Sequence, residues 1–91
     1  MNRLAGDLHY AHPSPRAGAR AIGWGGPGCE VPRERLVEWT CSCLPVRYEL
    51  ISGAGAMWIR RIEGDQVRET HRTVAAIVRE MWADLLDGRA A

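Results

Sequence analysis

Arginine is the residue type in this chain with the clearest potential for recognition chemistry. All twelve basic residues are arginines, since lysine is absent from the 91-residue sequence. Three of them, Arg47, Arg61 and Arg68, occur in consecutive segments that alternate apolar and polar residues. A guanidinium group presents its N–H donors in a planar fork that matches phosphate oxygens and the major-groove edge of guanine. If the segments are neighbouring strands, the three side chains form a surface suited to a nucleic acid.

The cysteines are a second candidate group, because thiolates bind zinc. Cys41-Ser42-Cys43 is a CxC motif, and a strand would direct both thiols to the same side. Further ligands for a tetrahedral site are present at Cys29, His71, His9 and His12. Structural zinc sites normally carry paired CxxC motifs or comparable knuckles, and this chain has a single CxC. We therefore favour cysteines that act as small apolar residues over a zinc site, and the sequence predicts no cofactor.

Catalytic chemistry has little support in the sequence. His71 follows Glu69 and Thr70, but neighbouring residues of a strand point to opposite faces, so a base and a nucleophile would not meet. The glycine-rich stretch at residues 23–28 lacks the lysine of a phosphate-binding loop. The sequence therefore predicts a protein that is not an enzyme.

Composition restricts the partners and indicates an origin. The formal net charge is +1, so any contact with nucleic acid must come from a local patch. No apolar run typical of a signal peptide or membrane span is present, which predicts a cytoplasmic protein with reduced thiols and no membrane partner. Abundant alanine, arginine and glycine, with no lysine or phenylalanine, indicate a high-GC bacterium or its phage or plasmid. Part of the arginine excess then reflects codon usage.

The chain divides at about residue 35. Residues 1–35 hold four of the five prolines and lack apolar periodicity, which is typical of a flexible arm. Trp24 is the exception in this arm, because an exposed indole would leave a large apolar surface in water, and we expect it to dock onto something. Residues 36–91 predict a small ββββα domain.

The second part contains four segments that alternate apolar and polar residues, each bounded by turn residues. Strands are predicted at residues 36–43, 46–52, 57–63 and 66–70. From Val74 onward, apolar residues recur at the spacing of one helical face. Thr70 or Thr73 would cap this helix, and Gly88 fits the position after its end. The predicted fold class is α+β: an antiparallel sheet of three or four strands packed on one C-terminal amphipathic helix.

The turns predict how the strands pair. A two-residue loop at Gly64-Asp65 places Arg61 opposite Arg68 and Arg60 opposite Glu69. If residues 53–55 form a three-residue loop, one face collects apolar side chains for the helix to cover, namely Val46, Tyr48, Leu50, Trp58, Ile62 and Val67. The opposite face then carries one row of arginines, namely Arg47, Arg61 and Arg68.

The arginine row has two interpretations. Because like charges destabilise a strand pair, either Glu49 and Glu63 neutralise the row in a solvated ion-pair surface, or an anionic partner does so. Arg60 lands instead on the apolar face, where an ion pair with Glu69 and stacking on Tyr48 would give it a structural role.

Residues 46–88 resemble the arm-type DNA-binding domain of tyrosine recombinases. The resemblance rests on the strand Trp58-Ile59-Arg60-Arg61, the Gly64-Asp65 turn, a short strand with Arg68, and an amphipathic helix that contains Trp82. In that family the exposed face of a three-stranded sheet enters the major groove. The resemblance therefore implies DNA contacts for Arg47, Arg61 and Arg68, and Arg72 at the helix start would extend the basic patch.

Two functions follow from these patterns. The first is nucleic-acid binding through Arg47, Arg61, Arg68 and Arg72. The alternative is a protein-interaction module, an adaptor or inhibitor that acts as a homodimer, because six aromatic residues, four of them tryptophan, exceed what one helix can bury. Trp24 and Trp39 are the residues expected to contact such a partner.

Overall fold

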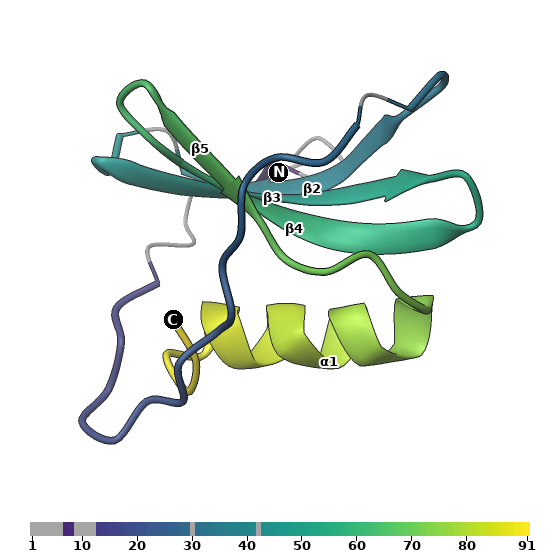
Figure 1. The fold of residues 1–91 in the computed structure, drawn as a ribbon. Helices are drawn as coiled ribbons and strands as arrows, with labels where there is room; N and C mark the ends of the chain where they lie inside the picture. The colour runs from purple at the N-terminus through teal and green to yellow at the C-terminus, as the bar shows by residue number, and fades with distance from the viewer. Residues whose placement is uncertain (1–6, 9–12, 30, 42) are drawn as a thin grey trace, which may run out of the picture.

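The chain folds into an antiparallel sheet with one helix across one of its faces (Figure 1). The computed structural model describes residues 7–8, 13–29, 31–41 and 43–91. The strands are β1 Asp7–Leu8, β2 Arg35–Thr40, β3 Val46–Gly53, β4 Ala56–Glu63 and β5 Gln66–Glu69, and the helix is α1 Ala75–Leu86. The strands lie side by side in sequence order; β2 to β5 are antiparallel, and the two-residue β1 runs parallel to β2. The predicted α+β class is confirmed.

The turn between β3 and β4 is shorter than predicted. Gly53 pairs with Ala56, so only Ala54 and Gly55 form the loop. Both have positive φ, 50° and 79°, as a type I′ turn requires. Alanine is rarely found there, which explains why the sequence favoured a three-residue loop. The turn at Gly64-Asp65 is as predicted, with Glu63 opposite Gln66.

The shorter turn shifts β4 by one residue against β3 and exchanges its faces. The core beneath the sheet contains Leu50, Met57 and Ile59 packed on Val78, Trp82 and Leu85 of α1. Tyr48 packs against this cluster, so the prediction for β3 is confirmed by Tyr48 and Leu50. The prediction for the later strands was wrong: Trp58, Ile62 and Val67 lie on the face opposite the helix.

Asparagine at position 54 is expected to stabilise the fold. Ala54 is exposed and holds a left-handed conformation, which asparagine adopts more readily than alanine. Ala54→Asn should raise the free energy of unfolding by about 0.5–1 kcal/mol. Urea denaturation of the variant beside the unaltered chain measures this difference. A fall in stability would show that the two-residue turn is not formed.

The helix begins at Ala75 and ends at Leu86. Neither threonine caps it: Val74 occupies the N-cap, the Thr70 hydroxyl accepts the N–H of Ile59, and the Thr73 backbone pairs with Met57. The apolar stripe is covered from Val78 onward, whereas Val74 and Ile77 stay exposed. The predicted stop at Gly88 is confirmed, because its φ is 82° and the N–H of Arg89 donates to the carbonyl oxygen of Asp84 at 2.8 Å.

Gly88 cannot accept a side chain without loss of stability. An added Cβ would combine left-handed strain with a collision against the Ser14 carbonyl oxygen. Gly88→Ala should cost about 2 kcal/mol. Thermal unfolding measures the cost, with Gly26→Ala as control because that position is open. Equal melting temperatures for the two variants would contradict the packing of residues 13–16 on the helix end.

Residues 13–25 run along the C-terminal residues 88–91 and then along the edge of the sheet (Figure 1). The N–H groups of Arg16, Arg20 and Ile22 donate to the carbonyl oxygens of Gly88, Arg89 and Ala91 at 2.8 Å each. Gly25 then pairs with Glu69 at the end of β5. The sequence predicted a flexible arm over residues 1–35. Its described part has specific backbone partners, and residues 1–6, 9–12 and 30 lie outside the described residues.

The face opposite the helix has its own small apolar centre. Trp58 and Ile51 are fully buried there. Gly53 lies against this centre, since a Cβ on it would be 3.2 Å from the Trp58 ring and 3.3 Å from the Val31 side chain. Residues 31–34 therefore help to cover Trp58, and the sheet is packed on both sides at this point.

Candidate binding site

The predicted row of three arginines is not formed. Arg61 and Arg68 face each other across β4 and β5, on the helix side of the sheet. Arg47 pairs with Ile62 and therefore lies on the opposite face. The cause is the shorter turn after β3, which moved β4 by one residue. The placement predicted from the turns for Arg61 and Arg68, on the face away from the helix, was therefore wrong.

Most of the candidate arginines have carboxylate partners within the fold. Arg47 forms an ion pair with Glu49 at 3.2 Å, and Arg61 forms one with Glu63 at 3.1 Å. Arg68 is exposed and makes no ion pair with the residues that the structure describes. Glu49 and Glu63 thus neutralise Arg47 and Arg61, as the first interpretation of the row expected, but they do not pair with Arg68.

Arg72 stacks on Trp58 on the face away from the helix. Its guanidinium carbon lies 4.1 Å from the ring centroid, a cation–π distance. Its Nη2 atom also donates to the Cys29 carbonyl oxygen at 2.7 Å. Arg72 therefore ties the segment before β2 to the sheet, and it does not extend a patch with Arg61 and Arg68.

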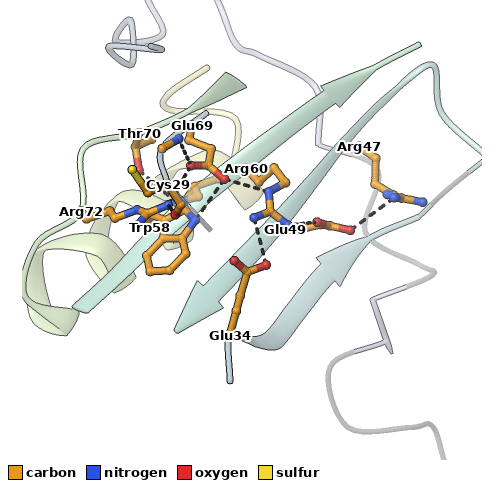
Figure 2. A network of polar contacts seen from close by, with 11 residues as sticks. Cys29, Glu34, Arg47, Glu49, Trp58, Arg60, Glu69, Thr70 and Arg72 are labelled. Carbon is orange, nitrogen blue, oxygen red and sulfur yellow. Dashed lines mark hydrogen bonds and ion pairs between the residues drawn. The ribbon is translucent and has the colours of Figure 1, made fainter. Parts of the chain in front are cut away.

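Arg60 and Glu69 form the centre of a polar network (Figure 2). Arg60 Nε donates to Glu69 Oε2 at 2.9 Å, and its Nη2 donates to Glu34 Oε2 at 2.9 Å. Its Nη1 lies 3.5 Å from Glu49. The structural role predicted for Arg60 agrees with this geometry, and so does its pairing with Glu69. The predicted stacking on Tyr48 was wrong, because Tyr48 lies on the other face.

The Glu69 carboxylate is the most buried charge of the network. Its side chain is 4% exposed and accepts hydrogen bonds from Gly28 N–H at 2.9 Å and Trp58 Nε1–H at 3.2 Å, besides the bond from Arg60. Burial opposes ionisation, but the bonds from Gly28 and Arg60 and the Arg60 charge outweigh it, so the pKa of Glu69 is lowered. For Arg60, burial is likewise outweighed by Glu69 and Glu34, and its pKa is raised.

This network holds the irregular segment before β2 onto the sheet. Its bonds join Gly28, Cys29 and Glu34 to strands β4 and β5 and to Arg72. The positive charges are matched by carboxylates at short range. The arrangement stabilises the fold and leaves little net charge for an external anion.

Trp24 lies beside an apolar hollow on the helix side of the sheet. Its ring packs against Tyr48, with centroids 5.8 Å apart and an angle of 31° between the planes. The hollow encloses about 550 Å³ and is lined by Pro13, Pro15, Trp24, Leu44, Pro45, Val46, Tyr48, Arg61 and Ala91. Arg61 is the only charged side chain among these residues. A hollow of this size and composition suits an apolar ligand with an anionic group.

Trp39 does not share this surface. It pairs with Glu49, which places it on the face opposite the helix, whereas Trp24 packs against the core on the helix side. Trp39 is also partly buried, and its backbone pairs with Asp7 of β1. The two tryptophans predicted to contact a partner are therefore separated by the sheet.

The cysteines and His71 do not come together. Within the described part of the chain, no group of three or more histidine, cysteine or acidic side chains is placed to hold a metal ion. His71 is exposed, Cys29 lies next to Arg72, and Cys41 and Cys43 contact each other. His9 and His12 lie outside the described residues. Thr70, considered beside His71 as a nucleophile, is 6% exposed, and its hydroxyl oxygen accepts the Ile59 N–H.

Comparison with protein-family models, characterised proteins and solved structures finds no match to the chain. Over the described residues, no helix has the length and apolar character needed to cross a membrane.

The sequence did not predict most of the residues that line the hollow. Trp24 was a candidate, but Tyr48, Pro13, Pro15 and Pro45 were not. The prolines were interpreted only as breakers of regular structure, although proline rings also form apolar walls. Tyr48 on the helix-side face was the available signal, because a half-buried aromatic ring near a strand end offers a stacking surface.

Proposed function

We propose that the protein is a non-catalytic interaction module that binds an extended segment of a partner protein in the hollow beside Trp24 and Tyr48. The observation that carries the proposal is the lining of this hollow: aromatic and proline rings, with Arg61 as the one charged side chain among the lining residues. Aromatic side chains that pack on each other form rigid grooves for extended peptides. Arg61 favours an acidic residue in the bound segment.

Peptide selection tests this function without a known partner. A phage library of random peptides is selected on the immobilised chain and, in parallel, on Trp24→Ala. We expect enriched peptides that combine proline or aliphatic residues with one acidic residue, and we expect their enrichment to be lost on Trp24→Ala. The absence of enrichment on the unaltered chain, or equal enrichment on both, would reject the proposal.

A second variant protects the test against misfolding of Trp24→Ala. The Arg61 side chain is 24% exposed, and among the described residues its one ion pair is with the half-exposed Glu63, so Arg61→Ala should leave the fold intact. We expect it to remove the preference for an acidic residue while apolar peptides are still selected. Arg79→Ala is the matched control, because Arg79 is exposed on α1 and does not line the hollow.

Nucleic-acid binding is the second candidate, and one observation favours it. Arg61 and Arg68 are cross-strand neighbours on one face, and Arg68 is exposed. Anisotropy of a labelled mixed-sequence DNA duplex, titrated at low and moderate salt, tests it with Arg61→Ala/Arg68→Ala. Salt-sensitive binding lost in this variant, and kept in the charge-matched Arg35→Ala/Arg79→Ala, would support it. No binding at low salt would remove it.

The proposed module acts as a homodimer in the cytoplasm, as the sequence predicted. Sedimentation velocity of the purified chain measures the assembly state directly. Because the hollow is built from one chain, we expect the monomer to bind the peptide as well.

A further inference from the structure

The CxC motif holds its two sulfur atoms in contact. Cys41 Sγ and Cys43 Sγ are 2.7 Å apart, and the N–H of Cys43 points at Cys41 Sγ from 3.4 Å. A disulfide bond is about 2.0 Å long, so the sulfurs need to approach by only about 0.7 Å to bond. The contact lies directly after β2, which ends at Thr40.

The two sulfurs differ in access to solvent. Cys41 is 2% exposed, whereas Cys43 is exposed. A reagent in solution therefore meets Cys43, whereas Cys41 is shielded from it and contacts Cys43. Cys43 is therefore placed to attack a dissolved disulfide, and Cys41 is placed to resolve the mixed disulfide that results.

We propose that Cys41 and Cys43 form a reversible dithiol–disulfide site that exchanges with low-molecular-weight disulfides. The Cys43 thiolate attacks one sulfur of the small disulfide, forms a mixed disulfide and releases one small thiolate. The Cys41 thiol then loses its proton and attacks Cys43 Sγ, which forms the Cys41–Cys43 bond and releases the second small thiolate. Two electrons pass from the protein to the small disulfide, and the two protein protons end on the released thiolates.

The surroundings affect the rate of this exchange and not its product. The hydrogen bond with Cys41, with the Cys41 charge adding to it, raises the pKa of the Cys43 thiol. Less thiolate is then present at neutral pH, which slows the first step. The second step is fast because the resolving sulfur is already in contact.

Cys29 provides an internal comparison. It is an exposed thiol that precedes β2, whereas the pair follows it, and its backbone is held by Arg72. A small disulfide should leave Cys29 with a stable adduct. At Cys43, by contrast, the Cys41 thiolate should displace the adduct.

Peptide mapping of the full chain after oxidation distinguishes these products. Trypsin cleaves after arginine, so residues 36–47 carry both Cys41 and Cys43 on one peptide, and residues 21–33 carry Cys29 on another. Reduced Cys29→Ser is incubated with oxidised glutathione, alkylated with iodoacetamide and digested. We expect peptide 36–47 to be lighter by two hydrogens, with neither glutathione nor alkyl groups. The unaltered chain should give the same peptide 36–47.

Removing one member of the pair reveals the intermediate. Cys41→Ser should retain glutathione on Cys43 and accumulate at least tenfold more of this adduct than Cys29→Ser. Glutathione on peptide 36–47 of Cys29→Ser, alkylation of both its cysteines after oxidation, or equal adduct levels in the two variants would overturn the proposal. Peptide mapping of Cys29→Ser tests the proposal even if Cys41→Ser misfolds, because Cys29→Ser retains both Cys41 and Cys43.

Discussion

Glu69→Gln is expected to lower the free energy of unfolding by about 3 kcal/mol, a large share of the stability of so small a domain. The substitution keeps the shape of the side chain but removes the charge that Arg60 and Arg72 face. Gly28 donates to one carboxylate oxygen and Trp58 to the other, so the amide keeps an acceptor for one of them and turns an NH2 donor toward the other. Urea denaturation at neutral pH measures the loss. Glu63→Gln is the control, because Glu63 is half exposed and its ion pair with Arg61 should be worth under about 1 kcal/mol.

The pH dependence gives the same prediction a second readout. The pKa of Glu69 is lowered in the fold from its ordinary value of 4.5, so its contribution to stability is fully present above that pH. The contribution is lost as the pH falls through the lower, folded-state pKa. The stability difference between the unaltered chain and Glu69→Gln should therefore be greatest at neutral pH and shrink as the pH falls below about 4.5. A constant difference would mean that Glu69 does not act through its charge.

Trp58→Ala should cost about 4 kcal/mol, because it opens a cavity at a fully buried position. The ring also donates to Glu69 and lies under Arg72, so its removal weakens the network that holds Gly28, Cys29 and Glu34. Thermal and urea unfolding measure the effect.

A conservative variant separates packing from the polar contacts of this ring. Trp58→Phe keeps most of the volume and loses the donor to Glu69, at a cost of about 1–2 kcal/mol. A loss below about 1 kcal/mol for Trp58→Ala would contradict a packed face opposite the helix.

Local patterns in the sequence were enough to predict the elements. The alternation in residues 46–52 and 57–63 and the helical spacing after Val74 correspond to β3, β4 and α1 within one or two residues. Gly64 and Gly88 marked their turns because a positive φ favours glycine strongly. The Arg60–Glu69 pair followed from the same turn, since a two-residue loop leaves one register.

The register of β3 and β4 could not be obtained in this way. Ala54 adopts a positive φ, an uncommon choice for alanine, so the sequence favoured the longer loop. The resulting slip of one residue placed Trp58 under the helix and joined Arg47 to Arg61 in a row. One unusual turn residue thus changed the expected function as well as the expected core.

The irregular segment before β2 explains what was missed in the site. Its contacts are backbone hydrogen bonds to Gly88, Arg89 and Ala91, and a hydrogen bond that the Gly28 N–H donates to the Glu69 carboxylate. Such contacts join residues far apart in sequence and leave no periodic pattern. The hollow beside Trp24 is formed by Pro13, Pro15 and Trp24 together with residues of β3 and β4 and Ala91. Its lining could therefore be recognised only in the folded structure.

The central claim is that the Trp24 hollow is the binding site, and the affinity of one selected peptide tests it most directly. Fluorescence anisotropy of the labelled peptide is measured with the unaltered chain, Trp24→Ala and Arg79→Ala. Loss of a central aromatic contact is worth about 2 kcal/mol or more, so Trp24→Ala should bind about 30-fold more weakly. Arg79→Ala should bind like the unaltered chain. Equal affinities for all three would place the peptide elsewhere and contradict the claim.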